Sequence, residues 1–297
     1  MRAKWTDLAM EARGSVPVSD VRLISGIERT VVRIEDEQTA RELGRPRGTY
    51  VTLSCPQTMT IELSMREALS WELAQAIRQM LPEHARTVLV TGLGNRSVTP
   101  DSLGPATIDK TLVTRHLLSG DYARSGLKSV CAIAPGVLGV TGVETVEMVE
   151  SLAHKLHPRA ILCIDSLAAR DSGRIGCTIQ ITNTGIQPGS GVGNHRKALT
   201  QDTLGVEVIA VGVPTVVYAA TLARDAFALL ATPEDDSGEE ALASMERELL
   251  GTELGNLIVT PRDIDAIVKD CATLIAGGIN RALQPSLSDA EIAQMMD

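Results

Sequence analysis

Two aspartates follow the buried-strand patterns of this sequence at positions where catalytic side chains are often found. Asp101 ends a segment that starts with the apolar run at residues 88–91, and Asp165 comes directly after the apolar run at residues 160–164. Short continuous apolar runs are typical of parallel strands that are buried on both faces. Since ligands bind beyond the carboxyl ends of such strands, we expect both carboxylates at one rim of the sheet. Two acids in one crevice suggest acid–base chemistry on a bond that is hydrolysed, although either aspartate could also cap a following helix.

Strand and helix patterns alternate along the chain. The expected strands are residues 21–24, 30–34, 50–53, 88–91, 130–134, 161–164 and 206–213. The expected helical segments are residues 37–43, 65–81, 106–118, 143–156, 166–169, 214–230 and 263–275, with a short helix in 287–297. This alternation predicts an α/β fold in which a mostly parallel sheet is sandwiched by helices, with a β-rich N-terminal portion. We expect a single domain over residues 8–297, with residues 232–256 as a solvated acidic insertion.

The composition argues against several classes of partner. Aromatic residues make up only 2% of the 297 residues and the net charge is -9, which is the opposite of a surface that binds nucleic acid. The longest apolar stretch, residues 208–223, is interrupted by Gly212 and Pro214 and is shorter than the roughly 20 residues that span a bilayer. The five scattered cysteines contain no CxxC pair, which argues against a disulfide framework or a thiolate zinc site. We therefore expect a cytoplasmic protein without membrane, nucleic-acid or cofactor partners.

Glycine-rich segments follow several of the expected strands. The first, at Gly92 and Gly94, is not a dinucleotide fingerprint because Ser97 stands where the third glycine belongs. The longest runs from Gly185 to Gly193 and lacks the GxSxG pattern of serine hydrolases. It is either a surface loop or a set of backbone N–H donors for a substrate carbonyl. The candidate substrate-binding residues are Gly185, Gly189, Ser190, Gly191 and Gly193.

Several long motifs occur together in this sequence. They are GLGN at 92–95, VTPDSLGP at 98–105, LVTRH at 112–116, AIAPGVLGVTGVET at 132–145, IDSLAAR at 164–170, NTGIQPGSGVGN at 183–194 and GVPTVV at 212–217. With these motifs the sequence resembles the germination protease family, the endopeptidases that degrade small acid-soluble spore proteins in endospore-forming bacteria. The resemblance implies an atypical aspartic peptidase with a core similar to that of the hydrogenase-maturation endopeptidases. The family's two aspartates fall on Asp101 and Asp165.

The resemblance also implies a homotetramer made as a zymogen in the cytoplasm of the forespore, later the spore core. Family substrates are cut after an acidic residue in a Thr/Ser-Glu-Phe/Ile-Ala context, and residues 6–9 read Thr-Asp-Leu-Ala. We therefore expect self-processing between Asp7 and Leu8, with residues 1–7 as a prosegment shorter than is usual in the family. The sequence departs from the family pattern at Arg96, Ser97 and Tyr218, while both aspartates are retained.

Hydrolysis by two carboxylates requires one ionised and one protonated acid, and repulsion between two acids in one site favours that arrangement. Two alternatives stay open at this point. The chain could be a metal-dependent maturation-type endopeptidase in which Asp101, Asp165 and His116 hold a metal ion, as acids at similar positions do in the hydrogenase-maturation enzymes. It could also be an inactive protein that binds spore proteins without cutting them.

Overall fold

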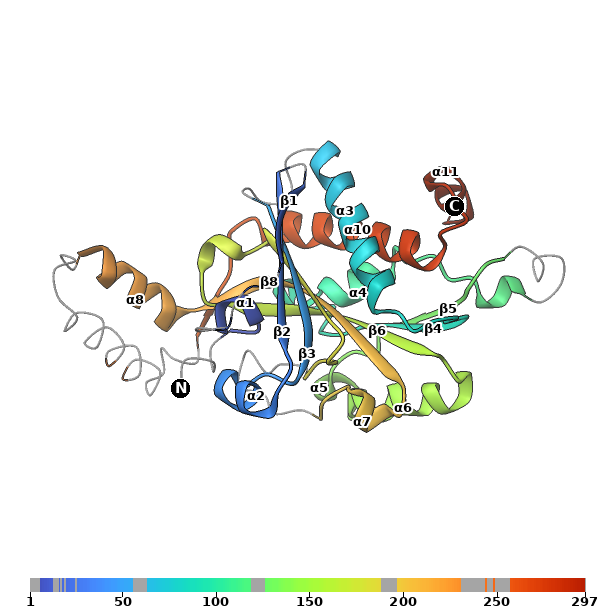
Figure 1. Ribbon diagram of the computed structural model, residues 1–297, viewed down its shortest axis with the longest axis horizontal. Helices are drawn as coiled ribbons and strands as arrows, with labels where there is room; N and C mark the ends of the chain where they lie inside the picture. The colour runs from blue at the N-terminus through green and yellow to red at the C-terminus, as the bar shows by residue number, and fades with distance from the viewer. Residues whose placement is uncertain are drawn as a thin grey trace.

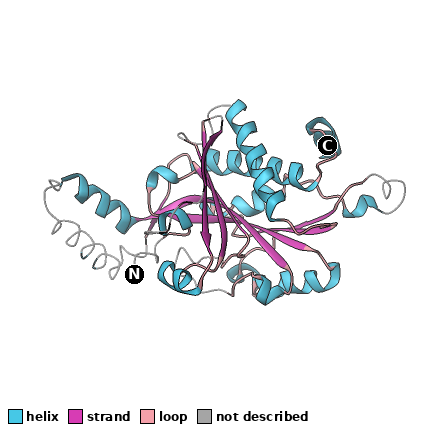
Figure 2. Ribbon diagram, in the orientation of Figure 1, coloured by secondary structure: helices cyan, strands magenta, loops and turns pink. Residues whose placement is uncertain are grey.

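One mixed β-sheet of nine strands organises the part of the chain that the computed structural model describes, namely residues 6–12, 16, 18, 20–24, 26–55, 63–118, 126–187, 197–230, 244, 248 and 257–296. The strands are β1 (Asp20–Ile24), β2 (Ile27–Ile34), β3 (Gly48–Ser54), β4 (Thr87–Gly92), β5 (Ser129–Ile133), β6 (Ala160–Ala169), β7 (Thr178–Thr182), β8 (Glu207–Tyr218) and β9 (Ile258–Val259). They lie in the order β1-β2-β3-β7-β8-β6-β4-β5, and β9 pairs with the end of β8. Helices cover both faces of this sheet, as Figures 1 and 2 show.

The helices are α1 (Ala9–Ala12), α2 (Glu37–Leu43), α3 (Leu63–Met80), α4 (Leu103–Ile108), α5 (Leu138–Thr141), α6 (Thr145–Leu156), α7 (Gln201–Leu204), α8 (Ala219–Leu230), α10 (Ile264–Leu283) and α11 (Asp289–Met296). Short 3-10 turns lie at η2 (Thr99–Asp101), η3 (Arg115–Leu118) and η5 (Ser172–Arg174). The α/β class and the β-rich N-terminal portion are therefore confirmed. The predicted insertion at residues 232–256 lies outside the described residues, apart from residues 244 and 248.

Parallel pairing is confined to one half of the sheet. β5, β4, β6 and β8 pair in parallel, as βαβ alternation predicts, whereas the pairs from β1 through β3 and β7 to β8 are antiparallel. The expectation of a mostly parallel sheet was therefore too broad. β1 and β2 are separated by only two residues, which permit only an antiparallel pair, whereas α2 lies between β2 and β3. These N-terminal strands extend the same sheet at its β7 side. Figure 1 shows β2 and β3 crossing β6 and β8 at a steep angle, in accordance with the twist of large sheets.

The larger core lies between one face of the sheet and helices α3, α4 and α10. α10 buries Ile264, Ile267, Val268, Cys271 and Ile275, a spacing of three to four residues that gives a helix one apolar face. This face packs together with α3 against the inward residues of β4, β6 and β8. Because this cluster contains more buried apolar residues than the one on the opposite face, we expect it to supply the larger part of the hydrophobic stabilisation.

A second core forms on the opposite face of the sheet, under α6 and α7. It contains alternate residues of the same strands, among them Leu89, Ile161 and Cys163, together with Val149 of α6 and Leu204 of α7. Each strand thus has one row of side chains for each core, so the buried β6 is apolar without alternation. Helices on both faces confirm the predicted sandwich.

Several elements differ from the sequence-based expectation. Residues 166–169 continue β6 instead of starting a helix, because they pair with residues 213–217 of β8. For the same reason residues 214–218, expected to begin a helix, continue β8, and α8 starts only at Ala219. The helix expected at residues 106–118 is divided into α4 and the separate turn η3. The strand β7 was missed, although its sequence Thr-Ile-Gln-Ile-Thr alternates polar and apolar residues, which is the period of a strand.

Candidate functional site

Asp165 lies inside β6 and not at its end, contrary to the sequence-based expectation. β4, however, stops at its pairing of Gly92 with Ile164, so Asp165 is the first residue of β6 beyond the end of β4. The side chain of Asp165 is almost completely buried, with 5% of its surface exposed. The N–H of Ser166 donates to Asp165 Oδ1 at 2.9 Å. The rim predicted from the sequence therefore exists, but it is formed by the end of β4. Because Asp165 lies within a strand, it caps no helix.

A row of buried polar residues crosses the sheet from Asp165. Asp165 pairs with Gly212 of β8, Gly212 pairs with Gln180 of β7, and Gln180 pairs with Thr52 of β3. Paired residues point to the same face of a sheet, so this row shares the face of the second core. Gly212 contributes no side chain, and a Cβ there would come within 2.5 Å of the side chain of Leu167. Burying polar groups is costly unless they bind other polar groups, so this row is a candidate binding site.

Burial raises the pKa of the Cys163 thiol, and the nearby Asp165 carboxylate raises it further. Cys163 lies two residues before Asp165 in β6 and belongs to the second core. A thiol in this environment stays protonated and behaves as a small apolar side chain. Cys163 is therefore a packing residue beside the candidate catalytic acid.

Asp101 lies in the turn η2, which follows β4 and contacts β6 and β8. Its Oδ2 accepts the backbone N–H of Asn95 at 2.8 Å, so the carboxylate points back to the loop that leaves β4. Helix α4 starts later, at Leu103, with Ser102 at the N-cap position. The Asp101 carboxylate therefore stabilises the loop between β4 and η2. Both aspartates lie at the end of the sheet where β4 finishes.

Gly94 allows the backbone to approach Asp101. It has a φ of +106°, and a Cβ at this position would lie 2.0 Å from the Asp101 carbonyl oxygen. We expect Gly94→Ala to displace Asp101 and lower peptidase activity by more than its loss of stability explains. Gly205→Ala is the matched control, because Gly205 has a φ of +64° with nothing near its Cβ position. We expect the left-handed conformation to cost each variant about 1–2 kcal/mol, with the close backbone contact as a further cost in Gly94→Ala only, and denaturant unfolding measures both losses. Equal activity in the two variants would contradict this role of the Asp101 loop.

The Asp7–Leu8 peptide bond is located in the interior of the protein. Asp7 N donates to Ala168 O at 2.8 Å, and Ala168 N donates to the Asp7 carboxylate at 2.8 Å. Leu8 is fully buried in a cluster with Leu167, Ala169, Ile175 and Val217. Leu167 and Ala169 are the next two residues of β6 on the same face as Asp165. The predicted self-processing site is thus seated on the strand that carries a candidate catalytic residue.

The Asp7 carboxylate also influences Tyr218. Burial is the main reason why the pKa of Tyr218 is raised to about 12, and the nearby Asp7 charge contributes to the increase. The hydroxyl of Tyr218 therefore stays protonated at neutral pH. Tyr218 is one of the positions where the sequence departs from the family pattern. Its position near Asp7 places that departure beside the N-terminal segment.

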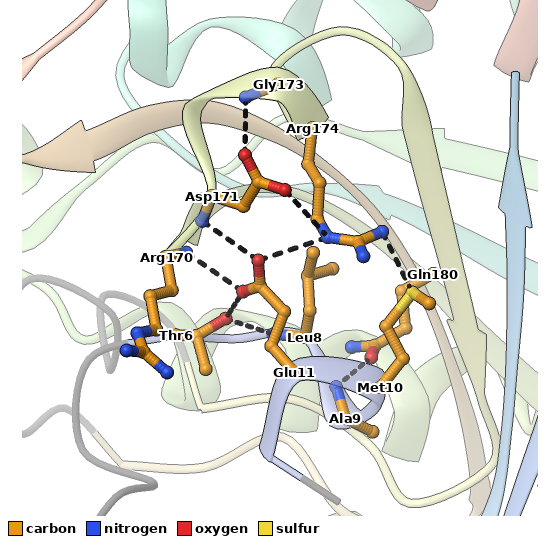
Figure 3. Close-up of polar contacts among 10 residues, drawn as sticks. All are labelled: Thr6, Leu8, Ala9, Met10, Glu11, Arg170, Asp171, Gly173, Arg174 and Gln180. Atoms are coloured by element: carbon orange, nitrogen blue, oxygen red, sulfur yellow. Dashed lines mark hydrogen bonds and ion pairs between the residues drawn. The ribbon is translucent and has the colours of Figure 1, made fainter. Parts of the chain in front are cut away.

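Glu11 fastens this segment to the turn after β6 (Figure 3). Its carboxylate accepts the N–H of Arg170 at 2.9 Å and the N–H of Asp171 at 3.0 Å, and it pairs with Arg174 Nε at 3.2 Å. Thr6 Oγ1 donates to the same carboxylate. A cavity of about 270 Å³ lies here, lined by Glu11, Arg170, Asp171, Arg174 and Asp225. No local sequence pattern indicates this role of Glu11, since the backbone N–H groups that it binds lie about 160 residues away.

Burial raises the pKa of Glu11 above its ordinary value of 4.5, although Thr6, the Asp171 N–H and Arg174 act in the opposite direction. A raised pKa contributes stability that is complete below pH 4.5 and is lost as the pH rises through the folded-state pKa. We therefore expect the docking of residues 6–12 to weaken with rising pH in this range and Glu11→Gln to remove the dependence. Hydrogen-exchange protection of Leu8 and Ala9, corrected for intrinsic rates, measures this. An unchanged pH profile in Glu11→Gln would assign the dependence to another group.

The glycine-rich loop is described only at its start. Gly185 has a φ of +78°, and a Cβ there would lie 2.2 Å from Leu199 O. The adjacent Ile186 exchanges backbone hydrogen bonds with Leu199, which closes the base of the loop. Gly189, Ser190, Gly191 and Gly193 lie outside the described residues. Gly185 is therefore a position of close backbone contact, and the substrate-binding role of the loop stays a prediction.

The proposed metal ligands do not form a chelating group. In the described ranges, no three His, Cys, Asp or Glu side chains are gathered so that they could hold a metal ion. His116 is located in η3, on the connection between α4 and β5, so Asp101, Asp165 and His116 are not brought together as such a set. The described helices also include none that is long and apolar enough to cross a membrane.

Comparisons with known proteins agree with the motifs. The family model for germination protease matches residues 9–232. The germination proteases of Clostridium perfringens and Clostridium acetobutylicum are 41% and 42% identical to this chain, and each alignment covers 98% of both sequences. That of Priestia megaterium is 37% identical over 87% of this chain and 83% of its own length.

Among solved structures, the [NiFe] hydrogenase maturation protease HycI from Thermococcus kodakarensis aligns with a TM-score of 0.34 and 14% identity, covering 68% of this chain and 97% of that one. The family assignment rests on the sequence matches, which extend over almost the whole chain at about 40% identity. This chain belongs to the germination protease family and is therefore a peptidase that acts on proteins.

Proposed function

We propose that this peptidase initiates the degradation of small acid-soluble spore proteins during germination, and that Asp101 and Asp165 activate the attacking water. The observation that carries the proposal is the buried Asp165 carboxylate at the end of β4, in a row of polar residues that crosses the sheet. The Asp101 turn lies at the same end and contacts β6. The spore-protein substrates and the two-aspartate chemistry come from the family resemblance.

In this mechanism one carboxylate takes a proton from water while the other, protonated, donates a hydrogen bond to the scissile carbonyl oxygen. The water oxygen then bonds to the carbonyl carbon, giving a tetrahedral intermediate. Transfer of a proton to the amide nitrogen allows the C–N bond to break and releases an amine and a carboxylic acid. Two interacting carboxyl groups titrate as a pair, so the role of the base is not assigned to either aspartate individually. Gly185, Gly189, Ser190, Gly191 and Gly193 would bind the substrate through backbone N–H groups; unchanged turnover in Gly189→Val and Gly191→Val would refute that part.

The N-terminal segment supports a self-processed zymogen. Residues 6–9 resemble the context that family substrates present at the cleaved bond, and they are seated beside β6. Cleavage between Asp7 and Leu8 would release residues 1–7. We further propose that the enzyme is a homotetramer in the cytoplasm of the forespore and spore core, without a cofactor and without direct nucleic-acid contacts.

The test is mass spectrometry of a purified small acid-soluble spore protein after incubation with wild type, Asp101→Asn and Asp165→Asn, each with and without EDTA. We expect cuts after Glu in the wild type only, with no effect of EDTA. Asp202→Asn, an exposed position on α7, is the matched control and should cut normally. Loss of activity with EDTA and recovery with a divalent metal would favour the metal-dependent alternative. Binding without any cleavage by wild type would favour an inactive binder.

A further inference from the structure

The side-chain amide of Gln180 holds both sides of the Asp7–Leu8 bond. Gln180 Nε2 donates to Asp7 O at 2.9 Å, and Gln180 Oε1 accepts the N–H of Ala9 at 2.6 Å. Figure 3 shows the second of these bonds, between Ala9 of α1 and the side chain of Gln180. Asp7 O is the carbonyl oxygen of the bond predicted to be cleaved. One amide group thus contacts the backbone immediately before and after Leu8, and it does so whatever the side chains are.

The surroundings of the segment distinguish side chains as well. The Asp7 carboxylate accepts the N–H of Ala168, a position where an acidic side chain is favoured. Leu8 is fully buried among Leu167, Ala169, Ile175 and Val217, which fits a large apolar residue. Ala9 is 1% exposed and packs near Val32 and Tyr50, which leaves room for a small residue only. The site therefore selects an acidic, a large apolar and a small residue in succession.

Gln180 lies in the same row of the sheet as Asp165, with only Gly212 between them. Neighbouring strands lie about 4.8 Å apart, so the backbones of Gln180 and Asp165 are about 10 Å apart. Both side chains lie on one face, and Gln180 is buried, with 7% of its surface exposed. A peptide that binds Gln180 therefore lies on the face that carries the proposed catalytic carboxylate. An amide N–H aimed at a scissile carbonyl oxygen is also suited to stabilise the negative charge that develops there.

We propose that Gln180 is a substrate-binding residue that spans the scissile bond, and that residues 6–9 occupy the substrate site as an internal ligand. The acidic, large apolar and small residues of this segment match the substrate context that the family resemblance already implies. Gln180 Nε2 binds the carbonyl oxygen of the acidic residue, and Oε1 binds the N–H of the small residue. This assignment rests on the proposed function for the identity of the cleaved bond, but the binding itself does not require cleavage.

The first test is binding of a fluorescein-labelled peptide, Thr-Asp-Leu-Ala-Met-Glu, to the full chain carrying Asp165→Asn together with Leu8→Asp, which puts a charge in the apolar cluster so that the internal ligand leaves the site. In a second peptide of the same sequence, an ester oxygen replaces the backbone N–H of the alanine. This change removes only the donor to Gln180 Oε1. We expect the ester peptide to bind roughly 3- to 10-fold more weakly, the range of one hydrogen bond. In Gln180→Leu the two peptides should bind equally, because the acceptor is gone. An equal ester effect in both chains would overturn the assignment.

The second test removes the internal ligand. Leu8→Asp places a charge in the apolar cluster and should release residues 6–9, so the peptide should bind at least about tenfold more tightly than to the parent chain. Unchanged affinity would show that the segment does not occupy the substrate site. Gln201→Leu, an exposed position on α7, is the matched control for Gln180→Leu, and circular dichroism checks that each variant is folded.

Cleavage kinetics give an independent readout with Asp165 intact. Gln180→Leu removes the N–H donor to the scissile carbonyl without adding a charge beside Asp165, and we expect kcat to fall about 10²-fold or more, as for other oxyanion donors. A change in KM alone would restrict Gln180 to backbone binding and overturn its contact with the reacting carbonyl. If the peptide binds as expected but spore proteins are not cut, the binding site stands and the proposed function fails. If spore proteins are cut but the ester peptide binds as tightly as the amide peptide, the proposed function stands and the binding role of Gln180 fails.

Discussion

Replacing Asp165 by Asn is expected to lower kcat/KM for peptide cleavage by about 10²–10⁴-fold, the usual contribution of a group that transfers a proton in the transition state. Asn has nearly the same shape, and the N–H of Ser166 can still donate to its side-chain oxygen in place of Asp165 Oδ1. We therefore expect little change in the free energy of unfolding. Steady-state kinetics on a spore-protein substrate, with thermal unfolding of the same sample, measures both quantities. A large fall in stability with an equal fall in activity would make Asp165 a structural residue.

The double variant distinguishes a shared mechanism from two separate effects. If Asp101 and Asp165 act as one acid–base pair, Asp101→Asn in the Asp165→Asn background should cost little further activity, because groups that act together are not additive. Independent roles would instead multiply the two losses. The exposed Asp202→Asn should leave kcat/KM unchanged and controls for the loss of one negative charge. Multiplying losses would contradict the paired mechanism while retaining a role for each acid.

Leu162→Ala should produce the largest loss of stability that we predict for a single side chain. Leu162 is fully buried at the centre of β6 and belongs to the larger core under α3 and α10. Leu162 pairs in register with Val90 and Ile209, and the three side chains pack on the face of the sheet opposite to Asp165. Truncation of a buried leucine costs about 2–5 kcal/mol, a large part of the 5–15 kcal/mol that stabilises a typical domain. Urea unfolding should show a lower midpoint with an unchanged slope.

Leu257→Ala is the matched control for that measurement, because Leu257 is 54% exposed beside β9. We expect a change within about 0.5 kcal/mol, as for most surface substitutions. If the two variants were equally stable, the assignment of the main core to the α3–α10 face would be wrong. The comparison separates the face of the sheet that provides stability from the face that carries Asp165 and Gln180.

Local patterns in the sequence predicted most of the elements around the site. The helix at residues 37–43 has its N-cap at Asp36 and ends at Gly44 with a φ of 61°, both of which are readable signals. The apolar runs of β4, β5, β6 and β8 identified the parallel half of the sheet. These predictions succeeded because side-chain periodicity and capping depend on residues close in sequence.

The predictions failed where strand length and pairing depend on distant residues. Residues 166–169 are extended because β8 pairs with them, and β8 lies about 45 residues later in the chain. The antiparallel half joins β3 to β7 across more than 120 residues, and no local pattern specifies that partner. Gln180 was missed for the same reason, since an isolated glutamine in a short alternating run carries no chemical signature until its partner segment is known.

The sequence by itself determined the α/β class and the resemblance to germination proteases, and it predicted the two candidate aspartates and the likeness of residues 6–9 to a cleavage site, because motifs and periodicity are properties of neighbouring residues. Only the tertiary structure placed Asp165, Gly212 and Gln180 in one row and seated residues 6–9 against β6 and Gln180. Strand register and the docking of a terminal segment result from contacts between residues far apart in the chain. Those contacts are set by the shape and polarity of the assembled core and not by local propensity.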